Sequence, residues 1–100
     1  MKKAAVGLAF TVAVALGGSW TGYVSESKCG AAHQDGSAAS VKCVTKCIKG
    51  GAKPVLVVDG KVIKIANPDK VAEKFYGLKV KVDGDMKDDT VTIASIDAAK

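Results

Sequence analysis

The chain has 100 residues with 15 basic and 10 acidic side chains, a formal net charge of +5. This length accommodates one domain. Every basic residue is a lysine, and the lysines are spread along the chain as on a solvated surface. Arginine, the residue best suited to forked contacts with phosphates and bases, is absent from the sequence. Its absence argues against a nucleic-acid-binding protein.

The amino-terminal segment has the organisation of a secretory signal peptide. Lys2 and Lys3 precede an apolar run of 13 residues over 4–16, and small residues over 16–19 offer cleavage after Gly17, Gly18 or Ser19. The run is too short for a stable transmembrane helix, and no cysteine follows it closely to carry a lipid. An uncleaved membrane anchor is the alternative.

We therefore expect a signal peptide over 1–19, one domain over 20–100, and a periplasmic or secreted protein that leaves the membrane after cleavage. Cleavage removes two lysines, so 13 lysines face 10 acids and the mature charge is +3. About 80 residues remain, near the lower limit for a self-sufficient hydrophobic core. Exported domains of this size usually need a disulfide or a metal as a staple.

Seven elements are expected in the mature chain. Strands are predicted from β-branched and alternating residues, and helices from apolar periodicity with polar caps and glycine stops. In order they are a strand (20–26), a helix from Ser37 or Ser40 to Ile48, strands (54–58 and 61–65), a short helix (67–77) and strands (78–82 and 90–96).

The connections are predicted from local turn chemistry. Asp59-Gly60 predicts a tight hairpin, and the segment 83–85 predicts a second turn. Asn67 is expected to cap the second helix with Pro68 at its first position. We expect Val71, Ala72 and Phe75 on one face of that helix, and a bulge between Ile93 and Ile96, where the apolar phase slips.

This order predicts a mainly β fold of the α+β type. It matches a small five-stranded OB-like barrel with an inserted helix between strands 1 and 2 and a short helix between strands 3 and 4. A two-layer α+β sandwich is the alternative.

All three cysteines and the only histidine lie in two short segments, Cys29 with His33 and Cys43 with Cys47. Cys43 and Cys47 are one helical turn apart, so both sulfurs lie on one face at the edge of the core. Three thiols and an imidazole are the ligand set of a structural tetrahedral zinc site, and copper(I) accepts it as well. We expect zinc, or alternatively copper, bound by Cys29, His33, Cys43 and Cys47 in a non-enzymatic protein.

Two other uses of the cysteines stay open. Cys29 can form a disulfide with Cys43 or Cys47, which would staple a ligand-binding module and leave one thiol. A thiol-redox or thiol-transfer protein would use the helical pair with Cys29 as partner, and Lys42 and Lys46 would favour thiolates. A bond within the pair is disfavoured, because Cβ atoms roughly 5–6 Å apart exceed the roughly 3.5–4.5 Å of a disulfide.

Other chemistries lack support. The haem-attachment motif C-x2-C-H is missing. Asp83, Asp85, Asp88 and Asp89 lack the closing glutamate of a calcium loop, so a solvated hairpin tip is the better interpretation. A metal ion is the partner that the sequence predicts.

Three segments resemble a group of small exported bacterial OB-like domains of unknown function. They are 22–30, which ends in Cys-Gly, 50–62 and 77–84. Members of this group have a strand ending in Cys-Gly, a nearby histidine and then C-x3-C. The resemblance covers essentially the whole mature chain. It implies an OB-like export domain with Cys29, His33, Cys43 and Cys47 as its marked positions, and it implies no activity.

Overall fold

A computed structural model of the chain describes residues 17–32 and 34–99. Within them, five strands form one closed barrel in the order β2-β3-β4-β6-β5. Their bounds are β2 Gly17–Glu26, β3 Pro54–Val58, β4 Lys61–Ile65, β5 Lys79–Lys87 and β6 Thr90–Ala98. Numbered along the chain, the strands follow the order 1-2-3-5-4 and close on strand 1, so the predicted mainly β, OB-like barrel is confirmed.

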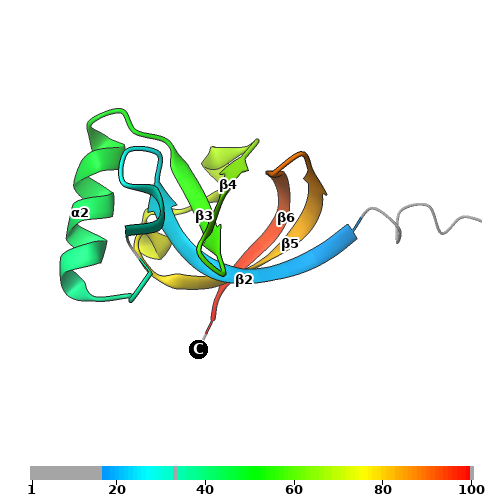
Figure 1. Cartoon of the computed structure of the whole chain (residues 1–100), viewed down its shortest axis with the longest axis horizontal. Coiled ribbons are helices and arrows are strands. Elements are labelled where there is room, and N and C mark those ends of the chain that lie inside the picture. Colours follow the sequence, from blue (N-terminus) through cyan, green and yellow to red (C-terminus); the bar gives the residue numbers. More distant parts are fainter. Residues whose placement is uncertain (1–16, 33, 100) are drawn as a thin grey trace, which may run out of the picture.

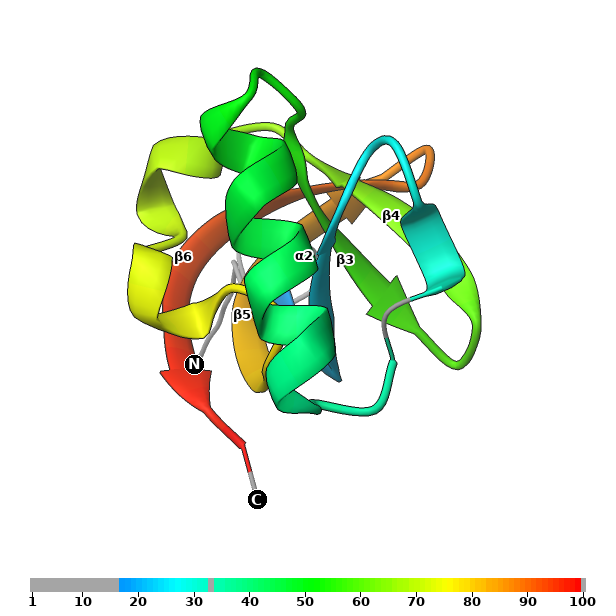
Figure 2. The same ribbon diagram turned by 90° about the vertical axis from the view of Figure 1, so that its left-hand side faces the viewer.

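The predicted insertion between the first two strands is the helix α2, Ala38–Lys49. Ser37 is its N-cap, with a side-chain oxygen that accepts the N–H of Ser40 at 3.1 Å. Gly50 follows its last residue. The helix lies across one end of the barrel (Figures 1 and 2). Val44, fully buried, is on the face turned toward the barrel, whereas Lys42 and Lys46 are exposed.

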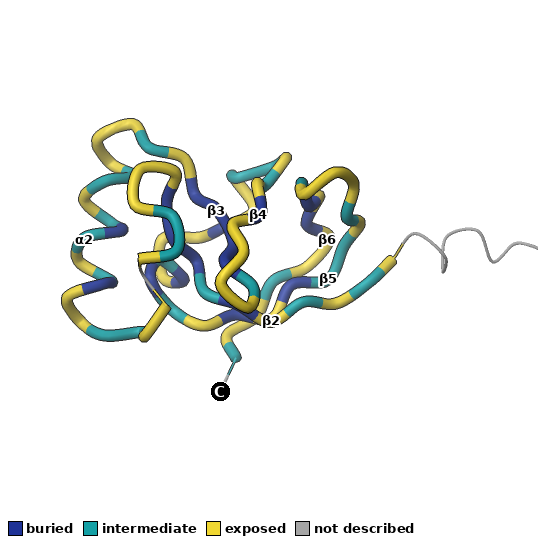
Figure 3. Tube along the Cα trace, viewed as in Figure 1, coloured by how far each residue is buried: buried dark blue, intermediate teal, exposed yellow. Residues whose placement is uncertain are grey.

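Alternation of buried and exposed residues along β5 and β6, together with continuously buried residues in β2 and β3, builds the barrel core. Nine buried residues form it: Val24, Leu56, Ile63, Val71, Phe75, Val80, Val82, Val91 and Ile93. The carboxyl end of β2 and the first four residues of β3 are buried, while the turns at Asp59-Gly60 and Asp88-Asp89 are exposed (Figure 3). Roughly 25 cal/mol per Å² of apolar surface removed from water stabilises this arrangement.

The second predicted helix is wrong. Two 3₁₀ turns, Pro68–Lys70 and Glu73–Phe75, replace it. Asn67 does not cap them: its amide donates to the carbonyl of Ile93 and accepts the N–H of Ile93, both at 2.8 Å. Tertiary bonding to β6 thus overrides the local cap signal. Val71 and Phe75 are buried as expected, but Ala72 is exposed.

The hairpin predictions have mixed outcomes. Asp59 and Gly60 both have positive φ, 50° and 81°, as a type I′ turn requires. The turn predicted over 83–85 is wrong, because β5 continues to Lys87 and the chain reverses at Asp88-Asp89, where φ is 50° and 61°. The bulge is confirmed: Asp83 pairs with Ser95 and Gly84 with Ile93, which leaves one extra residue on β6.

The first strand starts earlier than predicted. Gly17, Gly18 and Ser19 pair with β5, so β2 has 10 residues. Most of the predicted signal peptide, residues 1–16, lies outside the described residues. No helix in the described part of the chain is long and apolar enough to span a membrane.

Candidate metal and thiol centre

Cys29 lies in a turn that is organised by a buried carboxylate. Glu26, the last residue of β2, is 0% exposed. Its Oε2 accepts the N–H of Lys28 at 2.7 Å and its Oε1 accepts the N–H of Cys29 at 2.9 Å. Burying a carboxylate is costly unless its oxygens are hydrogen-bonded. These two bonds compensate part of that cost and hold the backbone of Cys29 close to the barrel end.

The second part of the centre is on α2. Cys43 and Cys47 are one turn apart, and both are partly buried at the border between the side of Val44 and the lysine-bearing side. All three cysteines are free thiols in this structure.

The fold brings Cys29 close to the helical pair. A hydrogen bond to Glu26 raises the pKa of the Cys29 thiol to about 11, and smaller contributions come from burial and from the charges of Glu26, Cys43 and Cys47. The pKa of Cys47 is also raised, first by burial and then by the charges of Glu26 and Cys43. Cys29, which is exposed, therefore lies within electrostatic range of Cys43 and Cys47. We call Cys29, Cys43 and Cys47 the thiol cluster.

A cavity of about 450 Å³ opens beside the helical pair. Besides Cys43 and Cys47 it is lined by Lys28, Lys46, Gly50 and Ala52. None of the described residues that line it is acidic. We call it the thiol cavity; it gives a solvent-borne ligand access to two of the three thiols.

The predicted fourth ligand, His33, lies outside the described residues. Among residues 17–32 and 34–99, no three histidine, cysteine, aspartate or glutamate side chains are arranged as ligands of one ion. The thiol cluster as it stands is therefore a set of neighbouring thiols, and ligation by all three would require their side chains to turn toward a common point.

Glu26 is the site residue that sequence reasoning missed. Its signal was its phase: it lies two residues after Val24, so both point to the same face of β2, and Val24 faces the core. Acidic side chains are almost never fully buried unless they are paired. A glutamate in a core-facing phase, three positions before a cysteine, is therefore the signal that could have identified this residue.

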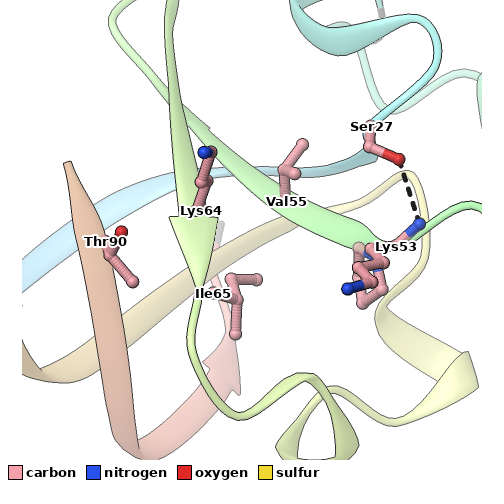
Figure 4. A pocket seen from close by; sticks show the side chains of 7 residues that line it. Ser27, Lys53, Val55, Lys64, Ile65 and Thr90 are labelled. Atoms are coloured by element: carbon pink, nitrogen blue, oxygen red, sulfur yellow. Dashed lines mark hydrogen bonds between the residues drawn. The ribbon is translucent and has the colours of Figure 1, made fainter.

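A second cavity, of about 360 Å³, lies on the side of the barrel where β4 and β6 pair over only two residues each. Figure 4 shows Val55 and Ile65 between Thr90 on one side and Ser27 with Lys53 on the other. The hydroxyl oxygen of Ser27 accepts a hydrogen bond from the backbone N–H of Lys53 at 3.1 Å. Among the described residues that line this side cavity there is no cysteine.

Comparison of the chain with family models, with curated proteins and with solved structures finds no match. The resemblance to small exported bacterial domains stays a prediction from the sequence.

Proposed function

We propose that the protein is a non-enzymatic module that binds one soft metal ion through thiolates of Cys29, Cys43 and Cys47. The observation that supports this proposal is the convergence of all three cysteines on one end of the barrel. Zinc is the expected ion and copper(I) the alternative, because thiolates favour both. His33, four residues after Cys29 in the sequence, is the proposed fourth ligand.

The chemistry of the thiols supports binding over redox catalysis. A redox nucleophile needs a lowered pKa, so that the thiolate is present at neutral pH. The pKa values of Cys29 and Cys47 are instead raised. A cation displaces thiol protons when it binds, so a ligand set can be protonated while empty.

Location is part of the proposal. The predicted signal peptide over 1–19 places the protein in the periplasm or outside the cell, where a thiol persists if it is buried or ligated. Metal ligation accounts for an odd number of cysteines, whereas one disulfide leaves one thiol over.

Cadmium titration under anaerobic, reducing conditions tests the metal site, because cadmium–thiolate bonds absorb in the ultraviolet in proportion to their number. We expect one ion per chain, with absorption reduced in C29S, C43S and C47S. S95A, a change far from the cysteines in sequence, serves as the matched control and should behave as the wild type. Zinc at a hundredfold excess over its Kd should add about 2.7 kcal/mol to the free energy of unfolding. A chain that shows neither absorption nor stabilisation would overturn the proposal.

One observation favours a second candidate, thiol transfer: the thiol cavity exposes Cys43 and Cys47 beside two lysines. The bond would form between Cys29 and one helical cysteine, since the helical pair is too widely spaced in an intact helix. Mass spectrometry of the unreduced protein after treatment with a small disulfide separates the two candidates. A redox protein would yield a Cys29 disulfide, and a metal module would be protected by prior loading with zinc.

A further inference from the structure

The side cavity lies on the outer face of the barrel, where β3 begins and β4 ends. Val55 and Lys64 are register partners, and Lys64 pairs in turn with Thr90 of β6. Because register partners point to the same face of a sheet, these three side chains lie in one row. Leu56, the next residue after Val55, belongs to the barrel core, so the row is on the opposite, outer face.

The pairing of β2 with β3 continues for one residue beyond the two strands. The N–H of Ser27 donates to the carbonyl of Lys53 at 2.8 Å, and the N–H of Lys53 donates to the Ser27 hydroxyl at 3.1 Å. Lys53 is two residues before Val55, so both side chains point to one face. Lys53 and Lys64 are therefore diagonal neighbours across two strands, a spacing that long side chains can bridge. The fold, and not a local run of lysines, places them around one opening.

The side cavity has an apolar lining between its polar ends. Val55 and Pro54 are buried, and Ile65 is half-buried and packs against the barrel core. In Figure 4, Val55 and Ile65 lie in the middle of the site. The volume of about 360 Å³ is within the roughly 300–1,000 Å³ range of small-molecule pockets, which combine an apolar lining with a few polar groups that orient the ligand.

The polar groups of the side cavity have unused bonding capacity within the described part of the chain. The two ion pairs found there involve other lysines, so neither Lys53 nor Lys64 has a carboxylate partner. The Thr90 side chain makes no hydrogen bond, and the Ser27 hydroxyl acts only as an acceptor. Two ammonium groups and two hydroxyl protons are therefore available as donors to a ligand.

No acid among the described residues lines the side cavity. The acids adjacent in sequence to lining residues are Asp89, which precedes Thr90, and Glu26, which precedes Ser27. Asp89 forms an ion pair with Lys61 at 2.7 Å. Glu26 points to the other face of β2 from Ser27 and accepts two backbone N–H groups of the turn that follows. Neither carboxylate occupies the place that a ligand would take between the two lysines.

We propose that the side cavity binds a small carboxylic acid with an apolar body. The hydrocarbon lies against Val55 and Ile65, and the carboxylate accepts hydrogen bonds from Lys53, Lys64 and the hydroxyl of Thr90. An inorganic anion would leave the apolar lining unused, and a neutral hydrocarbon would leave the donors without an acceptor. The thiol cluster takes no part, so this inference does not rest on the proposed metal binding.

NMR titration of the protein with acetate, butyrate and hexanoate tests the inference through the ligand. We expect the largest shifts at the backbone amides of Val55, Ile65 and Thr90. Affinity should rise about two- to fourfold with each methylene, because each one removes further apolar surface from water. Hexanamide, which has the same body without the charge, should bind at least about fivefold more weakly than hexanoate.

Two double variants test it through the protein. K53Q/K64Q should weaken hexanoate binding about five- to thirtyfold, since two exposed ion pairs are lost. K42Q/K70Q removes the same charge from exposed lysines that do not line the cavity, so it should keep the wild-type affinity. All four lysines are exposed, so both variants should fold.

Three results would overturn the inference. Equal affinity for acetate and hexanoate would show that the apolar lining contributes nothing. Equal weakening in the two double variants would mean that the ligand responds to net charge and not to this cavity. Shifts confined to residues away from the side cavity would place the ligand elsewhere. Each of these results would leave the proposed metal binding standing, because no cysteine lines this cavity.

Discussion

Two carboxylates, Glu26 at the thiol end of the barrel and Asp83 in the β5–β6 hairpin, each join separate segments of the chain, but in opposite surroundings. Glu26 is fully buried and accepts two backbone N–H groups in the turn that carries Cys29. Asp83 lies at the surface and accepts the hydroxyls of Ser19 and Ser95. We call Ser19, Asp83 and Ser95 the polar row.

The difference shows where the fold includes a desolvation cost, which is at Glu26 and not at Asp83. The polar row follows the strand register, since Ser19 pairs with Asp83 and Asp83 with Ser95, so its bonds add to a ladder that exists anyway. Glu26 occupies a core-facing position that an apolar residue would fill at no desolvation cost. A buried charge that organises the turn of a cysteine is expected where a site needs that cysteine held in place.

The largest effect that this comparison predicts is on stability at the thiol end. Glu26→Ala leaves the N–H groups of Lys28 and Cys29 without their acceptor, and the free energy of unfolding should fall by about 2–4 kcal/mol. Urea denaturation measures it. Glu73→Ala is the matched control: that side chain is 61% exposed, in a surface ion pair with Lys49, and its loss should cost less than about 1 kcal/mol. Equal losses in the two variants would remove the contrast between the buried and the surface carboxylate.

The hairpin also has a position that is sensitive to substitution, Gly84. The reason there is close backbone packing and not charge. A Cβ on Gly84 would lie 2.0 Å from the carbonyl oxygen of Thr92. Gly84→Ala should therefore lower the free energy of unfolding by about 1–3 kcal/mol, through forced separation of β5 and β6 at the bulge. Gly50→Ala provides the comparison, because its Cβ would meet nothing nearer than 3.5 Å and its φ is −84°. A G84A variant as stable as G50A would contradict this packing.

Gly84 also shows why one turn was predicted wrongly. Asp83-Gly84-Asp85 has turn composition, but the glycine serves the close approach of two strands, a long-range requirement that composition does not express. Asp59-Gly60 was predicted correctly, because a type I′ turn needs only its own two residues. The cap of α2 at Ser37 is local in the same sense.

In the thiol centre, too, some features depend on local sequence and others on long-range packing. The spacing of Cys43 and Cys47 is a property of one helix and could be predicted from the sequence. The approach of Cys29 depends on how the end of β2 meets α2, and the part played by Glu26 depends on its burial. Asn67 is another residue whose role depends on long-range contacts. Its amide bonds to Ile93, 26 residues away, and not to the turn that it precedes.

The reactivity of Cys29 sharpens the comparison further, because the thiolate is the form that reacts with alkylating reagents. The Glu26 hydrogen bond is the largest cause that raises the pKa of Cys29 from 9.0 to about 11. In a C43S/C47S background, Glu26→Gln should restore up to about a hundredfold in thiolate at neutral pH. Part of this is offset because nucleophilicity falls with pKa, so we expect about a tenfold faster reaction with iodoacetamide.

The measurement is the second-order rate constant under native conditions, with Glu73→Gln in the same background as the control. The stability effect has a stated sign as well. The raised pKa favours the folded state below pH 9.0 and loses that contribution as the pH rises toward about 11. Unchanged alkylation in the Glu26→Gln variant would mean that the carboxylate does not control the thiol.

The smallest predicted effect belongs to the polar row. In the uncleaved chain, and after cleavage at Gly17 or Gly18, which retains Ser19, the hydroxyls of Ser19 and then Ser95 lower the pKa of Asp83 below its usual 3.8. A lowered pKa stabilises the folded state above pH 3.8, and that contribution is lost as the pH falls through the lower folded value. Tm of Asp83→Asn should therefore lie slightly below that of the wild type at neutral pH and approach it in acid.

Asp85→Asn is the matched control, because Asp85 is exposed two residues along the same strand. Among the described residues no hydrogen bond or ion pair involves its side chain. Its Tm difference from the wild type should not close in acid in the way that the difference of Asp83→Asn does. If both variants behaved alike, the polar row would contribute nothing specific. Glu26 would then be the carboxylate whose hydrogen bonds stabilise the fold, because only Glu26 has exchanged its water for N–H donors of the protein.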